Sequence, residues 1–128
     1  MQQALHDAGL SPSDIKQVKR TRYVDATQRP RRIPGRGRRL WCTNTSGDLH
    51  QGVTGHPLGA AGALEAAAVL LSFEHSLIPP TANTTALGDD IHCDVVMGSP
   101  RAWTPGPTIS NNFGFGGHNG SIILAPAQ

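Results

Sequence analysis

The sequence contains little cysteine and no long hydrophobic run, and each shortage excludes a class of protein. Cys42 and Cys93 are its two cysteines, which excludes a disulfide framework and a Cys-x-x-Cys zinc site. No stretch approaches the roughly 20 apolar residues of a membrane-spanning helix. The N-terminus also lacks the basic-then-apolar layout of a secretory signal. At 128 residues, the chain is predicted to be one small, soluble, cytoplasmic domain.

The basic residues are distributed very unevenly along the chain. Ten of the 11 lie between Lys16 and Arg39, so residues 19–51 carry a net charge of +7 and the remainder −5. Such asymmetry is typical of proteins that contact nucleic acid or an anionic surface. One interpretation is therefore a binding module with a basic arm, and a competing explanation is given below.

The apolar pattern on either side of this basic segment predicts a mixture of helices and strands. Residues 59–74 are apolar on nearly every face and predict a buried core helix. The segment RPRRIPGRGRR has no apolar period and two prolines, so residues 19–51 are expected to form a disordered loop. The other expected elements are a helix at 2–9, strands at 15–18, 92–97, 108–113 and 121–124, and a hairpin turn joining the last two.

Two glycine-containing motifs, at residues 52–66 and 110–120, have the composition of an active site. His56 precedes the predicted helix, whose positive end disfavours an imidazolium, and a neutral imidazole can donate one hydrogen bond to a developing oxyanion. Gly114, Gly116 and Gly117 let the backbone approach a ligand closely. From the residues alone, a capping histidine and a simple hairpin turn explain the same features.

Four segments resemble, in the same order, the C-terminal part of the β-ketoacyl-[acyl-carrier-protein] synthases. These condensing enzymes of fatty-acid and polyketide synthesis belong to the thiolase-like superfamily. The resemblance covers residues 1–18 and 52–128 and implies an α/β fold in which a buried helix packs on a mixed sheet. The matching segments are ALHDAGLSPSDI (4–15), GVTGHPLGAAGALEA (52–66), IPPTAN (78–83) and SNNFGFGGHNG (110–120).

The resemblance implies a role for individual residues. His56 matches the catalytic histidine. The Phe115 side chain would gate the acyl pocket, while its N–H would help to form the oxyanion hole. The active-site loop would contain Phe113, Gly114, Gly116 and Gly117, with supporting roles for Glu65 and Asn119. No metal ion and no organic cofactor are implied.

The implied partners are acyl carrier protein, malonyl and acyl thioesters, and the N-terminal half of a synthase. That half would carry the nucleophilic cysteine, and the complete enzyme would be a homo- or heterodimer. We expect this chain to be incomplete and, alone, inactive. Two alternatives are a non-catalytic subunit similar to a chain-length factor and a pseudogene product.

The basic segment lacks two features of the family. A second catalytic histidine is absent, and Gln51 occupies the position of the lysine that pairs with the glutamate at Glu65. When the codons are read one base out of register, Val18 to Arg32 can become VNAHGTSTPLNDLAE, residues 39–41 VFG and residues 47–51 VTSTK, which restores both features. A compensated frameshift would also explain the abundance of arginine, which makes nucleic-acid binding the weaker hypothesis.

Overall fold

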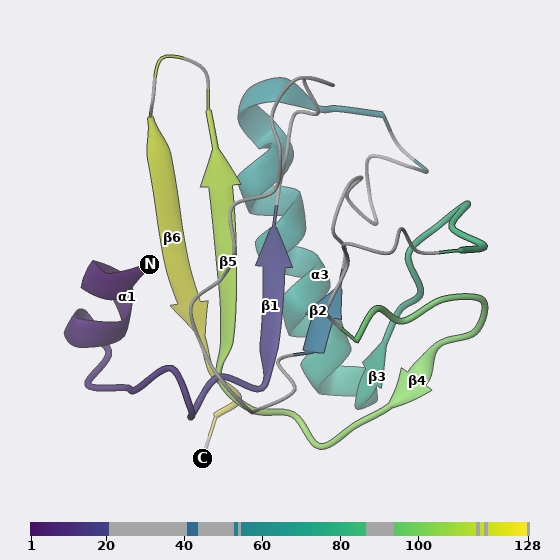
Figure 1. The fold of residues 1–128 in the computed structure, drawn as a ribbon, viewed down its shortest axis with the longest axis horizontal. Coiled ribbons are helices and arrows are strands. Elements are labelled where there is room, and N and C mark those ends of the chain that lie inside the picture. The colour runs from purple at the N-terminus through teal and green to yellow at the C-terminus, as the bar shows by residue number, and fades with distance from the viewer. Residues whose placement is uncertain are drawn as a thin grey trace.

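The described part of the chain forms a four-stranded mixed sheet, with a long helix against one face and a short helix beside one edge, together with a separate two-stranded sheet (Figure 1). The computed structural model describes residues 1–20, 41–43, 53, 55–86, 94–114, 116 and 118–127. The elements are α1 (Gln2–Asp7), β1 (Gln17–Arg20), β2 (Trp41–Thr43), a 3₁₀ turn η1 (Leu58–Ala60), α3 (Ala61–His75), β3 (Leu77–Ile78), β4 (Arg101–Ala102), β5 (Thr108–Phe113) and β6 (Asn119–Leu124).

The main sheet has the strand order β2-β1-β5-β6. Strand β1 pairs in parallel with both β2 and β5, whereas β5 and β6 form an antiparallel hairpin. Strands β3 and β4 form the small antiparallel sheet beside the far end of α3. Because side chains alternate between the faces of a strand, the pairing register fixes which residues lie on each face of the sheet.

The N-terminal segment packs against one face of the main sheet. Ile15, Val18 and Ile109 form a buried apolar cluster, and half-buried Leu5, Leu10 and Ile123 pack around it. The chain leaves α1 through Gly9, whose φ of 63° lies in the left-handed region that glycine adopts without steric cost. This turn brings the apolar residues of the N-terminal segment back onto the sheet.

The other face is covered by α3, which buries one stripe of residues. Ala61, Glu65, Ala68, Val69 and Ser72 are buried, and their spacing of three or four places them on one side of the helix. Leu64, Leu70 and Leu71 are instead 43%, 54% and 54% exposed. The expectation of a helix buried all round is therefore wrong for this chain, because a single sheet covers only one side of a helix.

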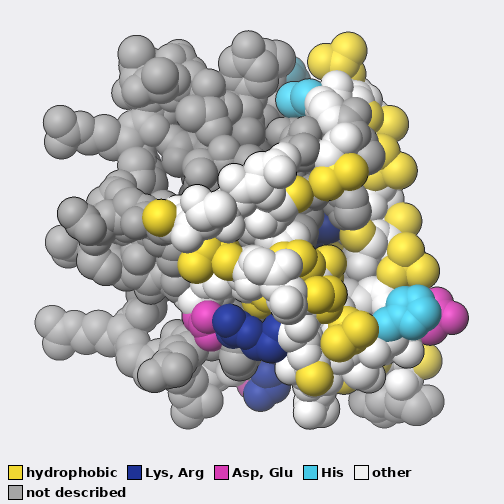
Figure 2. Space-filling model, turned by 90° about the vertical axis from the view of Figure 1, so that its right-hand side faces the viewer, with side chains coloured by type: hydrophobic (Ala, Val, Ile, Leu, Met, Phe, Trp, Pro, Cys, Tyr) yellow, Lys and Arg dark blue, Asp and Glu magenta, His cyan; other side chains and the backbone are white. Residues whose placement is uncertain are grey.

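Exposed apolar side chains are also visible on other parts of the described surface (Figure 2). Val53 and Leu58 near the start of α3, and Ile122 on the edge strand β6, are 74%, 75% and 48% exposed. No helix in the described ranges is long and apolar enough to cross a membrane.

The expected elements with regular apolar patterns are confirmed. Helices at 2–9 and 59–74 correspond to α1 and α3, and the predicted hairpin corresponds to β5 and β6. Of the strand expected at 92–97, the described residues 94–97 show only a bridge at Asp94, and buried Val95 and Val96 follow without regular pairing. Residues 92 and 93 lie outside the described residues.

Two described parts of the loop expected at 19–51 are strands. Lys19 and Arg20 belong to β1, and Trp41–Thr43 forms β2 against β1. The backbone of β1 offers hydrogen-bonding groups to a neighbouring strand whatever side chains that strand carries. The remainder of this predicted loop lies outside the described residues.

Candidate active site

The two glycine-containing motifs meet at one end of the molecule. Strand β5 ends beside the first turn of α3, at the top of Figure 1. The two elements approach closely there, because a Cβ atom added to Gly62 would lie 3.3 Å from Nδ2 of Asn112. The small residue at position 62 therefore allows the helix N-terminus to approach the end of β5.

His56 lies in the turn that leads into η1 and α3, and its side chain is exposed. The Leu58 N–H donates a hydrogen bond to Nδ1 of His56, with an N···N distance of 3.1 Å. A backbone N–H can only donate, so Nδ1 is the acceptor and a neutral ring carries its proton on Nε2. In this arrangement Nε2–H is the hydrogen-bond donor of a neutral His56 ring.

The backbone of this turn adopts two left-handed conformations. Gly55 has a φ of 74° and Leu58 a φ of 48°. A positive φ is unusual for leucine, and such residues are concentrated at functional turns. The two residues lie on either side of His56, immediately before the helix begins.

The second motif forms the tight connection between β5 and β6. The Gly114 N–H donates to the His118 carbonyl oxygen at 2.8 Å, and a Cβ on Gly114 would lie 2.9 Å from that same oxygen. Gly116 has a φ of 71°. Phe113 is half-buried at the end of β5 and pairs with Asn119 of β6, whereas Phe115 and Gly117 lie outside the described residues.

Glu65 lies in the interior of the molecule, one turn along α3 from Ala61. Its side chain is fully buried, and Ser110 Oγ of β5 donates a hydrogen bond to Oε2 at 3.3 Å. A carboxylate without solvent needs hydrogen bonds or a counter-charge. Ser110 was not predicted as a site residue, although its position two residues before Asn112 places it on the same face of the strand.

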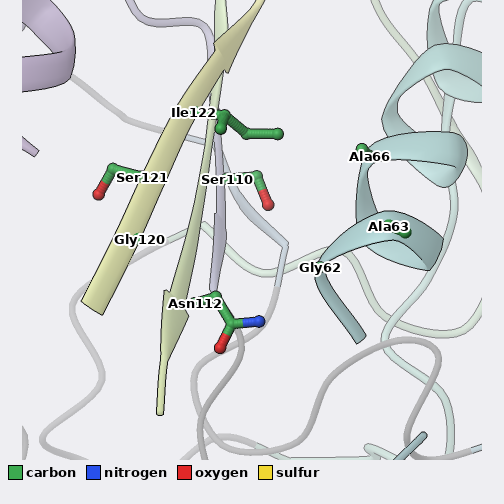
Figure 3. A pocket seen from close by; sticks show the side chains of 8 residues that line it. All are labelled: Gly62, Ala63, Ala66, Ser110, Asn112, Gly120, Ser121 and Ile122. Carbon is green, nitrogen blue, oxygen red and sulfur yellow. The ribbon is translucent and has the colours of Figure 1, made fainter. Parts of the chain in front are cut away.

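A cavity of about 310 Å³ lies between part of α3 and the β5–β6 hairpin. Figure 3 shows Ser110, Asn112 and Ile122 directed toward the helix and Ser121 directed away from it. The orientation of Ser121 follows from its hydrogen bond to Oδ1 of Asn111, at 2.7 Å. The residues that line the cavity are Gly62, Ala63, Ala66, Ser110, Asn112, Gly120, Ser121 and Ile122.

Among the described residues, the structure brings His56 and the Phe113–Asn119 connection to one end of the molecule and places Glu65 below them. Sequence reasoning missed Asn112 and Ser110, whose alternation along β5 is the signal that could have identified them. The described residues contain no group of three His, Cys, Asp or Glu side chains able to hold a metal ion.

The architecture is that of the C-terminal half of a thiolase-like fold. A solved ishigamide ketosynthase/chain length factor superimposes with a TM-score of 0.73 at 27% identity, over 99% of this chain and 32% of that one. Residues 50–85 match the sequence model of the β-ketoacyl synthase C-terminal domain, the region that contains His56 and Glu65.

The chain is similar to the C-terminal part of the β-ketoacyl synthases. The 3-oxoacyl-[acyl-carrier-protein] synthase 2 of Mycobacterium leprae is 38% identical over 94% of this chain. The enzyme of the same name from Coxiella burnetii is 33% identical over 98% of it. The chain spans 29% and 31% of these relatives' lengths.

Proposed function

We propose that this chain is the C-terminal portion of a condensing enzyme that joins an acyl thioester to malonyl-acyl carrier protein. The observation that carries the proposal is His56 itself, whose Nδ1 accepts a hydrogen bond from the Leu58 N–H, so that a neutral ring carries its proton on Nε2. The close approach of the first turn of α3 to the end of β5, and the chain's similarity to the β-ketoacyl synthases, support the same reaction.

In the proposed reaction, the malonyl thioester first loses carbon dioxide. The electron pair of the broken C–C bond moves onto the thioester oxygen and forms an enolate. His56 would donate its Nε2–H to that oxygen. A hydrogen bond that is already oriented before charge develops stabilises the transition state more than the ground state.

The enolate carbon then attacks the acyl thioester held on the cysteine of the N-terminal part. The tetrahedral oxyanion would accept a hydrogen bond from the Phe115 N–H, with Phe113, Gly114, Gly116 and Gly117 shaping the loop and Asn119 supporting its return. The attack forms the new C–C bond. Collapse of the intermediate then re-forms the carbonyl as a ketone, breaks the C–S bond and releases the cysteine thiolate. Glu65 would act at a distance, by holding α3 on the sheet.

A chimaera tests this assignment. Residues 52–128 would replace the matching part of the full-length Mycobacterium leprae synthase, with and without His56→Ala. We expect the variant to lose about 10²–10³ in malonyl decarboxylation, the usual cost of one oriented donor, while acyl transfer to the cysteine continues. A variant that decarboxylates normally but cannot be acylated would show that the role assigned to His56 is wrong.

Phe115→Ala in the same chimaera is the matched comparison. The substitution leaves the backbone N–H in place and removes only the ring. Acyl-length preference should therefore change while decarboxylation is retained.

A non-catalytic subunit is the second candidate, because the structural neighbour is described as a ketosynthase/chain length factor. In that case residues 52–128 would support assembly of the chimaera but not its turnover. A chimaera that assembles and forms no 3-oxoacyl product would favour this candidate.

A further inference from the structure

The interface between α3 and the main sheet contains a second buried charged residue, Lys19 of β1. Lys19 is 2% exposed and Glu65 is 0% exposed. A buried ammonium and a buried carboxylate are each costly unless they are paired or strongly hydrogen-bonded. Both residues therefore require polar partners within the same interior.

The strand register places Lys19 on the face of the sheet that meets α3. Lys19 pairs with Ser110 across the parallel β1–β5 ladder, and residues paired in this way have side chains on the same face. The next pair on this face, two residues down the ladder, shows this directly, because Thr108 Oγ1 donates to Oε1 of Gln17 at 3.3 Å.

Ser110 then connects this face to Glu65. Its side chain points toward α3 in Figure 3 and donates to the Glu65 carboxylate. Lys19 is thus the immediate neighbour, on the same face, of the residue that already holds Glu65. The Lys19 backbone is itself anchored, because Asn111 Nδ2 donates to the Lys19 carbonyl oxygen at 3.4 Å.

We infer that Lys19 is the charge partner of Glu65, and that this buried pair fixes α3 on the sheet. The assignment concerns the folded chain and does not depend on the proposed condensation.

The composition of the chain supplies matched controls. It contains two lysines, Lys16 and Lys19, and two glutamates, Glu65 and Glu74. Lys19 and Glu65 are buried, whereas Lys16 and Glu74 are exposed. Any effect of charge removal that is specific to the buried pair can therefore be separated from a general effect of net charge.

The first experiment is a double-mutant cycle on the 128-residue chain, measured by thermal unfolding. Lys19→Met and Glu65→Gln should each lower the unfolding midpoint by about 10 °C, because each leaves one buried charge uncompensated. The double variant removes both charges and should recover most of that loss. Lys16→Met and Glu74→Gln should each change the midpoint by less than about 2 °C.

A second experiment needs no variant and remains decisive if the single variants do not fold. In the uniformly labelled wild-type chain, NMR should detect a slowly exchanging Lys19 ammonium with a coupling through a hydrogen bond to the Glu65 carboxylate carbon. Lys16 should show neither feature. Additive losses in the cycle, or a Lys19 ammonium that exchanges as fast as that of Lys16, would overturn the pairing.

Discussion

At the scale of single residues, the glycines of the β5–β6 connection differ sharply in what they require. Gly114 lies so close to the His118 carbonyl that a Cβ atom would be 2.9 Å from its oxygen, whereas Gly120 has nothing within 4 Å of the same atom. The contact at Gly114 is with backbone, which cannot rotate away as a side chain can. Position 114 therefore needs glycine for space.

We expect Gly114→Ala to destabilise the chain by about 1–3 kcal/mol, the usual cost of forcing extra volume into a tight contact. The Gly114–His118 hydrogen bond would lengthen as the turn opens. Urea unfolding of the variant, with Gly120→Ala as the control, measures the effect. Equal stability of the two variants would show that the turn can relax without cost.

The same scale shows the limit of sequence reasoning about His56. Its place before a helix predicted a neutral ring, but the sequence did not indicate which nitrogen would carry the proton. That choice depends on the Leu58 N–H, which donates to Nδ1. The position of this N–H is set by the backbone angles of His56 and Pro57, which residue types alone do not predict.

At the scale of elements, the predictions succeeded where the apolar period is strong. Helix α3 and the β5–β6 hairpin begin and end within about two residues of their expected positions. Strand β2 was missed because Trp41–Thr43 follows an arginine-rich segment without a period, and its pairing with β1 is a long-range contact. The burial of Lys19 was missed for a related reason, since its charge favours an exposed position.

Helix α3 has apolar side chains on more sides than the fold covers. A helix that is apolar on all sides is normally covered on all sides, yet this sheet covers the Glu65 and Val69 side and leaves Leu64, Leu70 and Leu71 more than 40% exposed. The apolar residues on the open side contribute little to the stability of this chain.

This difference predicts opposite responses to substitution on the two sides of α3. Leu70→Gln and Leu71→Gln should each change the free energy of unfolding by less than about 0.5 kcal/mol, as at other surface positions. Val69→Ala, at a residue that is 1% exposed, should cost about 2 kcal/mol through lost burial and the cavity left behind. Chemical denaturation of the three variants measures both effects, and a large loss at Leu70 or Leu71 would mean that the open side is covered in solution.

At the scale of the whole molecule, the chain holds one side of the proposed reaction. In that proposal His56 would face the malonyl group and the β5–β6 connection would face the acyl thioester. The chain spans 32% of its structural neighbour. Fold similarity supports the family, and activity requires the reacting groups themselves.

We accordingly expect the purified 128-residue chain to form no 3-oxoacyl product from acyl- and malonyl-acyl carrier protein. Condensation needs a thiolate activated by a nearby base or helix N-terminus. Cys42 lies within β2, which offers no helix N-terminus, and Cys93 belongs to the sequence HCDVV, which resembles no nucleophile motif of the family. Oriented donors can stabilise an oxyanion, but without a nucleophile there is no acyl-enzyme for the enolate to attack.

Radiolabelled malonyl-acyl carrier protein provides the measurement, with the full-length Mycobacterium leprae synthase as the positive control. Release of labelled carbon dioxide and formation of the labelled 3-oxoacyl product are followed separately, since they report different steps. The control should yield both, and this chain should yield no condensation product. Product formation that survives Cys42→Ala and Cys93→Ala would show that the chain uses another nucleophile. Product lost with either substitution would identify that cysteine as the acyl carrier and contradict the inactivity expected here.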